Sequence, residues 1–310
     1  MIRAVIVDPH NKKSFSIQEV EAPKAQPWEA IVQVKAFSLN RGEVSEAIKL
    51  QENSRPGWDF SGIVLQEAVS GVGPKKGSRV VGLSLTKGAW AEEIAAPAAT
   101  LAEIPDGITF EQAASLPVAG LSALYALRKG GLLLGKRVLI TGSTGGVGLF
   151  VHQLAALSGA YTIGVARSES KAEQVRAFGA NEVLVGDDVT KAISANGPYD
   201  FIIDSVGGDT LAALFPQLIP QGICVSLGHS SSESTTLNIL GLGGRTLYSF
   251  FLGEEFNRHE PAPDLALLAR LVAEGKLQTI IQVQKSWEEI DEVAHQLIDR
   301  QFIGKAVLTI

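Results

Sequence analysis

The chain has 310 residues, a formal net charge of -6 and a single cysteine, Cys224. This length accommodates two domains with a sizeable core in each, and the scattered basic residues argue against a nucleic-acid surface or an anionic-membrane patch. One cysteine cannot form a disulfide framework, so we expect Cys224 to be a buried strand thiol. Neither a secretory signal pattern nor an apolar stretch long enough to span a bilayer is present, which predicts a cytoplasmic protein.

Short β-type runs separated by Pro, Gly and Asn turns fill the first 110 residues. Such runs predict an antiparallel barrel or sandwich rather than strands that alternate with helices. From Thr109 the sequence becomes helical, with Pro117 as a break. The predicted strands are Arg3–Asp8, Ser14–Glu21, Ala30–Phe37, Phe60–Glu67, Arg79–Leu83 and Ala89–Ile94.

A strand, a glycine turn and a helix follow one another in the centre of the chain. The apolar run Val138–Ile140 breaks into Gly142, Gly145 and Gly148, spaced as G-x-x-G-x-x-G, and helical spacing then resumes. Glycine lets the backbone approach a pyrophosphate closely, and the start of the helix offers unpaired N–H groups to the anion. A second strand, Tyr161–Ala166, closes a βαβ unit, so together these features predict a dinucleotide cradle.

The end of that second strand carries cations rather than an acid. Arg167, Ser168 and Lys171 follow it, where the ribose of a dinucleotide is recognised, about 20 residues beyond the glycine turn. A carboxylate there would accept from the ribose hydroxyls of NAD, whereas a cation beside a hydroxyl suits the extra phosphate of NADP. These residues therefore predict NADPH, the alternative being that they decorate a solvated helix start.

Strands and helices alternate through the rest of the centre, which predicts a doubly wound parallel sheet. The carboxyl ends of such strands line the crevice where a dinucleotide lies, so the residues that follow two of them, 205–207 and 228–230, are candidates for binding. His229 is a candidate proton donor or an ordinary solvated loop residue. The further predicted helices are 169–178, 209–218, 264–274 and 287–300, and the further strands are 182–185, 199–204, 222–227, 279–284 and 305–310.

Several motifs, in their order along the chain, resemble the zinc-independent, zeta-crystallin-like quinone oxidoreductase branch of the medium-chain dehydrogenase/reductase superfamily. They are Val32–Glu43, Pro56–Val64, Ser115–Ala123, Gly142–Ala160, Tyr199–Gly208 and Gly304–Ile310. The resemblance implies an α/β fold, with a Rossmann doubly wound parallel sheet and a GroES-like β-barrel catalytic domain. It places the catalytic domain at 1–113, with 251–310 returning to it, and the Rossmann NADP-binding domain at 114–250. It also implies bound NADPH and a homodimer.

The same comparison bears on metal. Zinc-dependent members of the superfamily carry a Gly-His-Glu segment where this chain has Trp58-Asp59-Phe60, and they hold a structural zinc in a loop with four cysteines. The five histidines here are dispersed, and none forms a pair with ligand spacing. We therefore expect no metal site. Without a Lewis acid to activate an alcohol, the expected chemistry is reduction of an electron-poor acceptor.

The resemblance also assigns roles to single residues. It implies that Asn40 faces the nicotinamide, where its amide would hold the carboxamide or polarise a substrate carbonyl, with a plain turn role as the alternative. Arg41 would stabilise the anion that hydride addition creates, or form a surface salt bridge. For Asp59 we expect a structural hydrogen-bonding role. The candidate cofactor-binding residues are Ser122, Gly142, Ser143, Thr144, Gly145, Gly146, Val147, Gly148, Arg167, Ser168, Lys171, Ser205, Val206, Gly228, His229, Ser230, Phe250, Phe251 and Leu252.

Taken together, the sequence predicts an NADPH-dependent reductase of quinones or α,β-unsaturated carbonyl compounds that transfers hydride without zinc. Residues 41–57 lack the tyrosines that many quinone oxidoreductases carry after the position of Asn40, so the acceptor and the proton donor stay open. One alternative is an enoyl-thioester or polyketide-type enoyl reductase. The other is a non-catalytic NADPH-binding sensor or crystallin-like protein.

Overall fold

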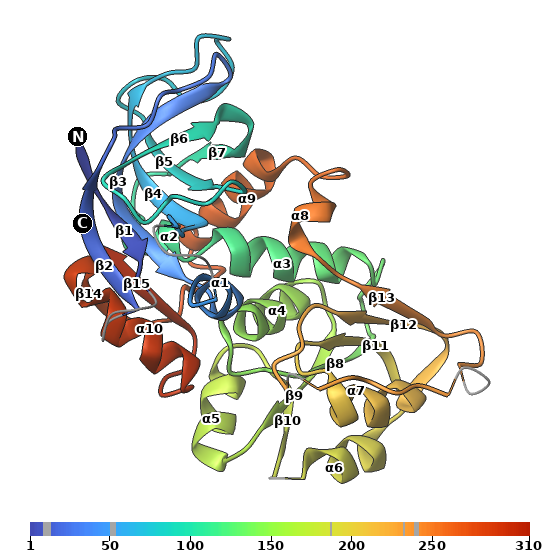
Figure 1. Cartoon of the computed structure of the whole chain (residues 1–310). Coiled ribbons are helices and arrows are strands. Elements are labelled where there is room, and N and C mark those ends of the chain that lie inside the picture. The colour runs from blue at the N-terminus through green and yellow to red at the C-terminus, as the bar shows by residue number, and fades with distance from the viewer. Residues whose placement is uncertain (9–13, 50–53, 187, 232, 239–241) are drawn as a thin grey trace. The chain divides into compact units, whose positions relative to one another are not determined.

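The structure is a computed structural model that describes residues 1–8, 14–49, 54–186, 188–231, 233–238 and 242–310. The chain divides into two compact units, whose elements are labelled in Figure 1. Unit 1 comprises Met1–Leu121 and Phe256–Ile310, and unit 2 comprises Ser122–Glu255. That unit 1 is the catalytic domain and unit 2 the nucleotide-binding domain stays a prediction.

Unit 1 is built on a seven-stranded sheet in the order β14-β15-β3-β4-β5-β7, with β6 also paired to β3. All of these pairs are antiparallel except β14 with β15, and a separate antiparallel pair joins β1 to β2. The sheet therefore joins the two ends of the sequence, because β15 pairs with β3. The strands are β1 (Ile2–Val7), β2 (Phe15–Val20), β3 (Glu29–Leu39), β4 (Asp59–Gln66), β5 (Arg79–Leu83), β6 (Glu93–Pro97), β7 (Leu101–Glu103), β14 (Ile281–Ser286) and β15 (Lys305–Thr309).

The strand predicted at 89–94 is wrong in its position, because β6 begins only at Glu93. The backbone N–H groups of Ala89 and Trp90 donate instead to the carbonyls of Gly57 and Pro56. Ala91 also forms an isolated antiparallel bridge with Ala4 of β1, so this stretch is held by β1 and by the residues that lead into β4 rather than in a continuous ladder. The short strand β7 has no counterpart among the predicted strands.

The helices of unit 1 lie between its strands and at its border with unit 2 along the sequence. Pro117, expected as a break, is the first residue of α3, a position where the missing N–H of proline costs nothing. The unit boundary between Leu121 and Ser122 lies within this helix. The helices are α1 (Arg41–Ala47), α2 (Phe110–Ala114), α3 (Pro117–Arg128), α9 (Pro261–Ala273) and α10 (Ile290–Ile298). Among the described residues, no helix is both long and apolar enough to cross a membrane.

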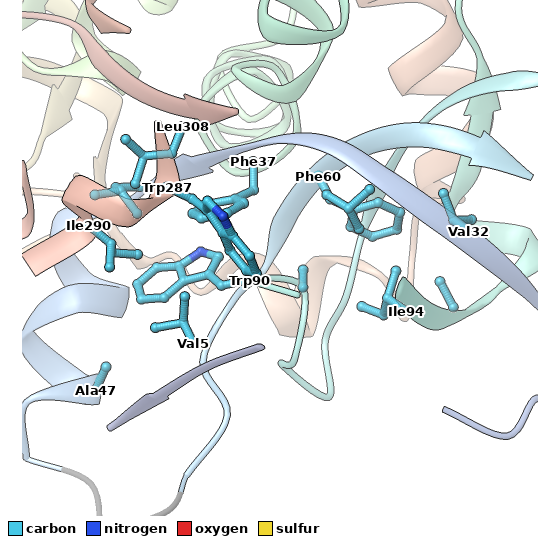
Figure 2. Close-up of a cluster of buried hydrophobic side chains, with 14 of the residues drawn as sticks. Val5, Val32, Phe37, Ala47, Phe60, Trp90, Ile94, Trp287, Ile290 and Leu308 are labelled. Atoms are coloured by element: carbon cyan, nitrogen blue, oxygen red, sulfur yellow. The ribbon is translucent and has the colours of Figure 1, made fainter. Parts of the chain in front are cut away.

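The core of unit 1 is centred on Trp90, which is fully buried (Figure 2). Its indole stacks on Phe37 of β3 at 5.8 Å between ring centroids and meets Phe15 of β2 edge to face at 5.7 Å. Trp287 and Leu308 belong to the same cluster, so residues from both ends of the chain share one core. Aromatic pairs of this kind add about 1 kcal/mol each beyond the area they bury.

Unit 2 is a six-stranded parallel sheet in the order β10-β9-β8-β11-β12-β13, which confirms the predicted doubly wound sheet. The strand order reverses between β8 and β11, the place where such sheets bind ligands at their carboxyl ends. Its strands are β8 (Arg137–Ile140), β9 (Tyr161–Ala166), β10 (Glu182–Val185), β11 (Tyr199–Asp204), β12 (Leu218–Ser226) and β13 (Thr246–Ser249). Its helices after α3 are α4 (Gly146–Leu157), α5 (Glu169–Ala177), α6 (Val189–Asn196), α7 (Gly208–Leu214) and α8 (Leu252–Glu255).

Two boundaries in unit 2 differ from the prediction. The helix expected at 209–218 ends at Leu214, and β12 begins at Leu218, four residues earlier than expected. Pro216 explains the early end, because proline removes a backbone donor and opposes continuation of a helix. Cys224 lies on β12 and is fully buried, as predicted, and burial raises the pKa of its thiol well above the ordinary value.

Candidate functional site

The glycine turn of unit 2 requires glycine at two of its three spaced positions for the protein's own packing. Gly142 has φ +64°, and a Cβ placed there would lie 2.3 Å from Oγ of Ser205. A Cβ on Gly148 would lie 2.4 Å from the carbonyl oxygen of Gly142. Gly148 therefore allows the start of α4 to pack closely against the turn that follows β8, and Gly142 allows that turn to approach Ser205 in the loop after β11.

Gly145 differs from its two neighbours because the protein does not fill the space beside it. It is exposed, and a Cβ there would meet only the Gly142 carbonyl oxygen, at 3.3 Å. Gly145 is also the N-cap of α4 and supplies no side-chain cap, so the N–H groups of the first turn are left to solvent or to a ligand. This is an open, side-chain-free approach to a helix start, and it fits the pyrophosphate of a dinucleotide.

The side chain of Ser143 forms its hydrogen bonds inside the protein, beneath the glycine turn. Its hydroxyl is fully buried, donates to the carbonyl of Ile140 at 2.7 Å and accepts from the backbone N–H of Val165 at 3.0 Å. The Ser143 side chain therefore joins β8 to β9 and leaves only its backbone for a ligand. Thr144, Gly146 and Val147 are half-buried in the turn itself.

The loops after β11 and β12 are held together at the carboxyl edge of the sheet. Asp204 accepts from the Thr141 hydroxyl at 2.5 Å and from the backbone N–H of Gly207 at 2.9 Å, and burial raises its pKa. The Ser205 hydroxyl donates to the Thr141 carbonyl, and the N–H of Ser230 donates to the Ser205 carbonyl. This arrangement brings the predicted residues around 205 and 230 to the same edge as the glycine turn.

The predicted phosphate-recognising residues lie directly after β9. Arg167 and Ser168 are exposed, Lys171 is half-buried on α5, and Ser168 is the N-cap of that helix. Within the described part of the chain, the Arg167 and Lys171 side chains form neither a hydrogen bond nor an ion pair. Their charges are thus available to an anion.

The remaining candidates differ in exposure. Phe250 is buried, and its N–H donates to the carbonyl of Ser226, whereas Phe251 is 65% exposed. His229 is exposed, and Ser122 is buried within α3. Val206, Gly228 and Leu252 are half-buried.

In unit 1, Asn40 directly follows β3 and is fixed in one orientation by its partners. Its Oδ1 accepts from Nζ of Lys305 at 2.6 Å, and its Nδ2 donates to Oδ2 of Asp59 at 2.9 Å and to Oε2 of Glu43 at 3.3 Å. Lysine only donates and a carboxylate only accepts, so the oxygen and nitrogen of the amide cannot exchange places. Both N–H donors are used, and the half-buried amide keeps only an acceptor lone pair for a ligand.

Asp59 has the structural role that the sequence predicts for it. It is fully buried, and it accepts from the Ser38 hydroxyl at 2.6 Å and from the backbone N–H of Val118 at 2.9 Å, in addition to Asn40. Nζ of Lys305 lies 3.4 Å away. Neither Lys305 nor Glu43 was among the predicted site residues, although both lie within motifs that carry the family resemblance. Their burial was the missing information, and the sequence pattern does not reveal it.

Arg41 is committed elsewhere. Its Nη1 donates to the carbonyls of Leu297 and Ile298, which are the last residues of α10. A cation at a helix C-terminus is favourably placed against the helix dipole. The structure thus gives Arg41 a stabilising contact, and its predicted role toward a substrate anion stays untested.

Metal ligands do not gather anywhere in the described residues: no three His, Cys, Asp or Glu side chains are close enough to share an ion. At the segment aligned with the zinc-binding motif, Asp59 is occupied by four protein donors. The residues present there do not fit a zinc ion. His10 lies outside the described residues.

Three comparisons place this architecture among known proteins. The profile of a family described as "Zinc-binding dehydrogenase" matches residues 146–270. Quinone oxidoreductase-like protein 2 of Bos taurus is 28% identical over 96% of this chain and 90% of its own, and acryloyl-coenzyme A reductase of Metallosphaera sedula is 26% identical over 99% and 100%. A quinone oxidoreductase of Pseudomonas syringae has a similar structure, with a TM-score of 0.88 and 25% identity over the full length of both chains.

Proposed function

Because the chain belongs to the quinone oxidoreductase-like branch of the medium-chain dehydrogenase/reductase superfamily, we propose that it reduces quinones or α,β-unsaturated carbonyl compounds with NADPH and without zinc. It is an oxidoreductase that uses a nicotinamide cofactor. The observation that carries the choice of NADPH is the pair of unengaged cations, Arg167 and Lys171, after β9. From the resemblance we also propose a homodimer in which unit 1 is catalytic and unit 2 binds the nucleotide, and from the sequence patterns we propose a cytoplasmic protein.

The residues that would hold the cofactor follow from their geometry. The open backbone at Gly145 and the uncapped start of α4 would bind the pyrophosphate, and Arg167 with Ser168 would bind the 2′-phosphate. The loops at Ser205 and Ser230 are joined by the hydrogen bond from the Ser230 N–H to the Ser205 carbonyl, and they would contact the rest of the cofactor. Ser122, Gly228, His229 and 250–252 stay proposed contacts on the strength of the resemblance.

When bound, the nicotinamide supplies the hydride that adds to an electron-poor carbon of the acceptor. The chain's part is to orient the reactants and to exclude water. We propose that Asn40 accepts a hydrogen bond from the carboxamide N–H2, because its amide has only an acceptor lone pair left. Stabilisation of the product oxyanion would then fall to backbone N–H groups or to Arg41, whose Nη1 is already engaged.

An enoyl-thioester reductase is the second candidate, and one observation favours it. A relative that aligns with 99% of this chain is named for acryloyl-coenzyme A, an α,β-unsaturated thioester. The two candidates share the hydride step and differ in the group attached to the carbonyl carbon of the acceptor, which is a thioester sulfur in the second candidate. They are therefore separated by substrate and not by cofactor.

The test is a measurement of NADPH oxidation by the purified protein with quinones, simple enones and enoyl-coenzyme A thioesters. The expected result is turnover of at least one quinone or enone above the rate without protein. Turnover of thioesters alone would favour the second candidate. Saturable NADPH binding with no turnover of any acceptor would favour a binding protein and contradict the proposal.

Replacing Arg167 with Asp tests the choice of cofactor. The variant places a carboxylate where we expect the 2′-phosphate, so NADPH should bind about tenfold or more weakly while NADH binding changes little. Fluorescence titration of both cofactors measures this, with Arg176→Asp as a control on α5, the helix that follows Arg167, since Arg176 pairs with Glu169. An equal loss for NADPH and NADH would show that Arg167 does not recognise the phosphate.

A further inference from the structure

Three ionisable side chains, Glu43, Asp59 and Lys305, are buried together in unit 1 around the amide of Asn40. Each is at most 3% exposed. They come from α1, β4 and β15, so the fold and not the local sequence brings them together. Two acids and one base cannot all be charged there without leaving one buried negative charge uncompensated.

Asp59 and Lys305 are satisfied as a charged pair. Asp59 receives hydrogen bonds from four donors, which is the coordination of an ionised carboxylate. Lys305 donates to the Leu39 carbonyl at 3.0 Å, to Asn40 and to Asp59, so each of its three N–H bonds has an acceptor. Burial lowers the pKa of Lys305, and the Asp59 carboxylate opposes that shift.

Glu43 is left without the contacts that an ionised carboxylate needs. Its Oε2 accepts two long bonds from Asn40, from the backbone N–H and from Nδ2, both at 3.3 Å, and a backbone hydrogen bond from Trp58 also favours the charged carboxylate. Its Oε1 is buried and has no hydrogen-bond partner among the described residues. Burial raises the pKa of Glu43 well above the ordinary value, and the charge of Asp59 adds to the rise.

Among the described residues, Lys305 is the only cation that acts on Glu43. The charged groups that act on it are Asp59 and Lys305. Helix α10 packs against α1, but its titratable side chains are engaged elsewhere. The Asp291 carboxylate accepts from the N–H of Phe15, Nδ1 of His295 lies 2.7 Å from the Asp291 backbone carbonyl oxygen, and Glu292 pairs with Lys285. The cluster is therefore neutral only when Glu43 carries a proton.

We propose that Glu43 is a positioning residue, held as a neutral carboxylic acid, that keeps the Asn40 amide in the orientation imposed by Asp59 and Lys305. This proposal rests on the proposed function only in the use it gives to Asn40. In the neutral state the second N–H of the Asn40 amide has a weak acceptor, and its first N–H stays on Asp59. An ionised Glu43 competes with Asp59 for the same amide and for Lys305, and Asn40 then loses its fixed place.

The charge state and the positioning role are tested separately. Infrared spectra of the whole protein at neutral pH should show a protonated carboxylic acid band that is absent from Glu43→Gln. Glu46→Gln is the matched control, because Glu46 lies on the same helix, is exposed and pairs with Lys87. The Glu46→Gln spectrum should retain the band.

The side-chain amide resonance of Asn40, identified by its loss in Asn40→Ala, reports the positioning. Glu43→Gln mimics the neutral acid and should leave this resonance near its wild-type position, whereas Glu43→Ala should shift it. With an acceptor that the protein turns over, kcat of Glu43→Gln should stay within about twofold of wild type, and that of Glu43→Ala should fall about tenfold or more.

Either of two results would overturn the proposal: a spectrum of Glu43→Gln identical to wild type in the carboxylic acid region, or an Asn40 resonance that neither substitution moves. Both measurements are made without turnover. If the protein reduces no acceptor, the proposed function is contradicted, but the infrared and amide-resonance measurements still test the role of Glu43.

Discussion

The two units bury ionisable groups in different ways. In unit 1, Glu43 and Asp59 share one base, Lys305. In unit 2, the buried Glu255 has a base of its own: Nζ of Lys129 lies 2.7 Å from Oε2, and the Tyr248 hydroxyl donates to Oε1 at 2.5 Å. The ammonium of Lys129 also lies 4.5 Å from the centre of the Tyr248 ring.

The two clusters differ in whether each buried carboxylate has enough hydrogen-bond donors. Every oxygen of Glu255 has a donor, so its carboxylate is stable as an anion, whereas Oε1 of Glu43 has none. Unit 2 has its own unsatisfied group in His152 on α4, which is fully buried with neither ring nitrogen bonded within the described residues. We therefore expect unit 1 to lose stability when Glu43 ionises, and unit 2 to lose stability when the imidazole of His152 is protonated.

The largest effect is expected from breaking the shared pair in unit 1. Lys305→Met leaves Asp59 buried without a cation, which should lower the free energy of unfolding by about 3–5 kcal/mol. Adding Asp59→Asn should recover part of the loss, because no uncompensated charge then remains. Urea unfolding measures both, with Lys285→Met on the neighbouring strand as control, where only solvent-accessible ion pairs are lost and little change in the free energy of unfolding is expected.

The balanced pair of unit 2 should respond less. Lys129 is 17% exposed and Tyr248 remains as a donor to Glu255, so Lys129→Met should cost about 2–3 kcal/mol in urea unfolding. A loss as large as that of Lys305→Met would contradict the contrast drawn between the two clusters.

A third change separates the units by pH. Burial lowers the pKa of His152 to about 3, so between pH 6.5 and 3 the unfolded chain binds a proton that the folded chain does not. The free energy of unfolding should therefore fall as the pH drops below about 6.5. His152→Leu should reduce the loss between pH 8 and pH 5 by about 2 kcal/mol. Equal pH dependence of variant and wild type would place the acid-sensitive group elsewhere.

Glu43 should act at the opposite end of the pH range. Its pKa is raised in the folded state, so its contribution to stability is present at low pH and is lost as the pH rises through the folded-state pKa. As the pH rises above the ordinary carboxyl range, Glu43→Gln should lose less stability than wild type. Well above pH 6.5 the His152 ring is neutral in both the folded and the unfolded chain, so His152→Leu should leave the pH dependence there unchanged.

How far the sequence predicts this molecule depends on how local the relevant contacts are. The glycine turn and the alternation of strands and helices are local patterns, so the strand–turn–helix order around Gly142 and Gly145 and the parallel sheet were predicted correctly, while cofactor binding there stays a prediction. The inward direction of the Ser143 hydroxyl depends on Val165 of another strand, and sequence alone does not give it. The burial of Glu43 likewise depends on contacts with distant residues, so the sequence indicates only that Glu43 belongs to a family motif.

Lys305 shows this limit most clearly. It is the first residue of the strand predicted at 305–310, and nothing in its sequence neighbours indicates burial. Its partners Leu39 and Asn40 lie more than 260 residues earlier in the chain. A buried lysine is rare enough that sequence reasoning places such a residue on the surface.

The position of β15 between β14 and β3 has a consequence for synthesis on the ribosome. The sheet of unit 2 is complete once residue 249 has emerged, whereas β3 waits for a neighbour that ends at residue 309. Until then β3 has an open edge and Asp59 lacks its ammonium partner, and such edges invite pairing with other nascent chains. Synthesis of unit 1 begins before that of unit 2 and ends after it. We therefore expect the folding of unit 1 to depend more on chaperones than the folding of unit 2.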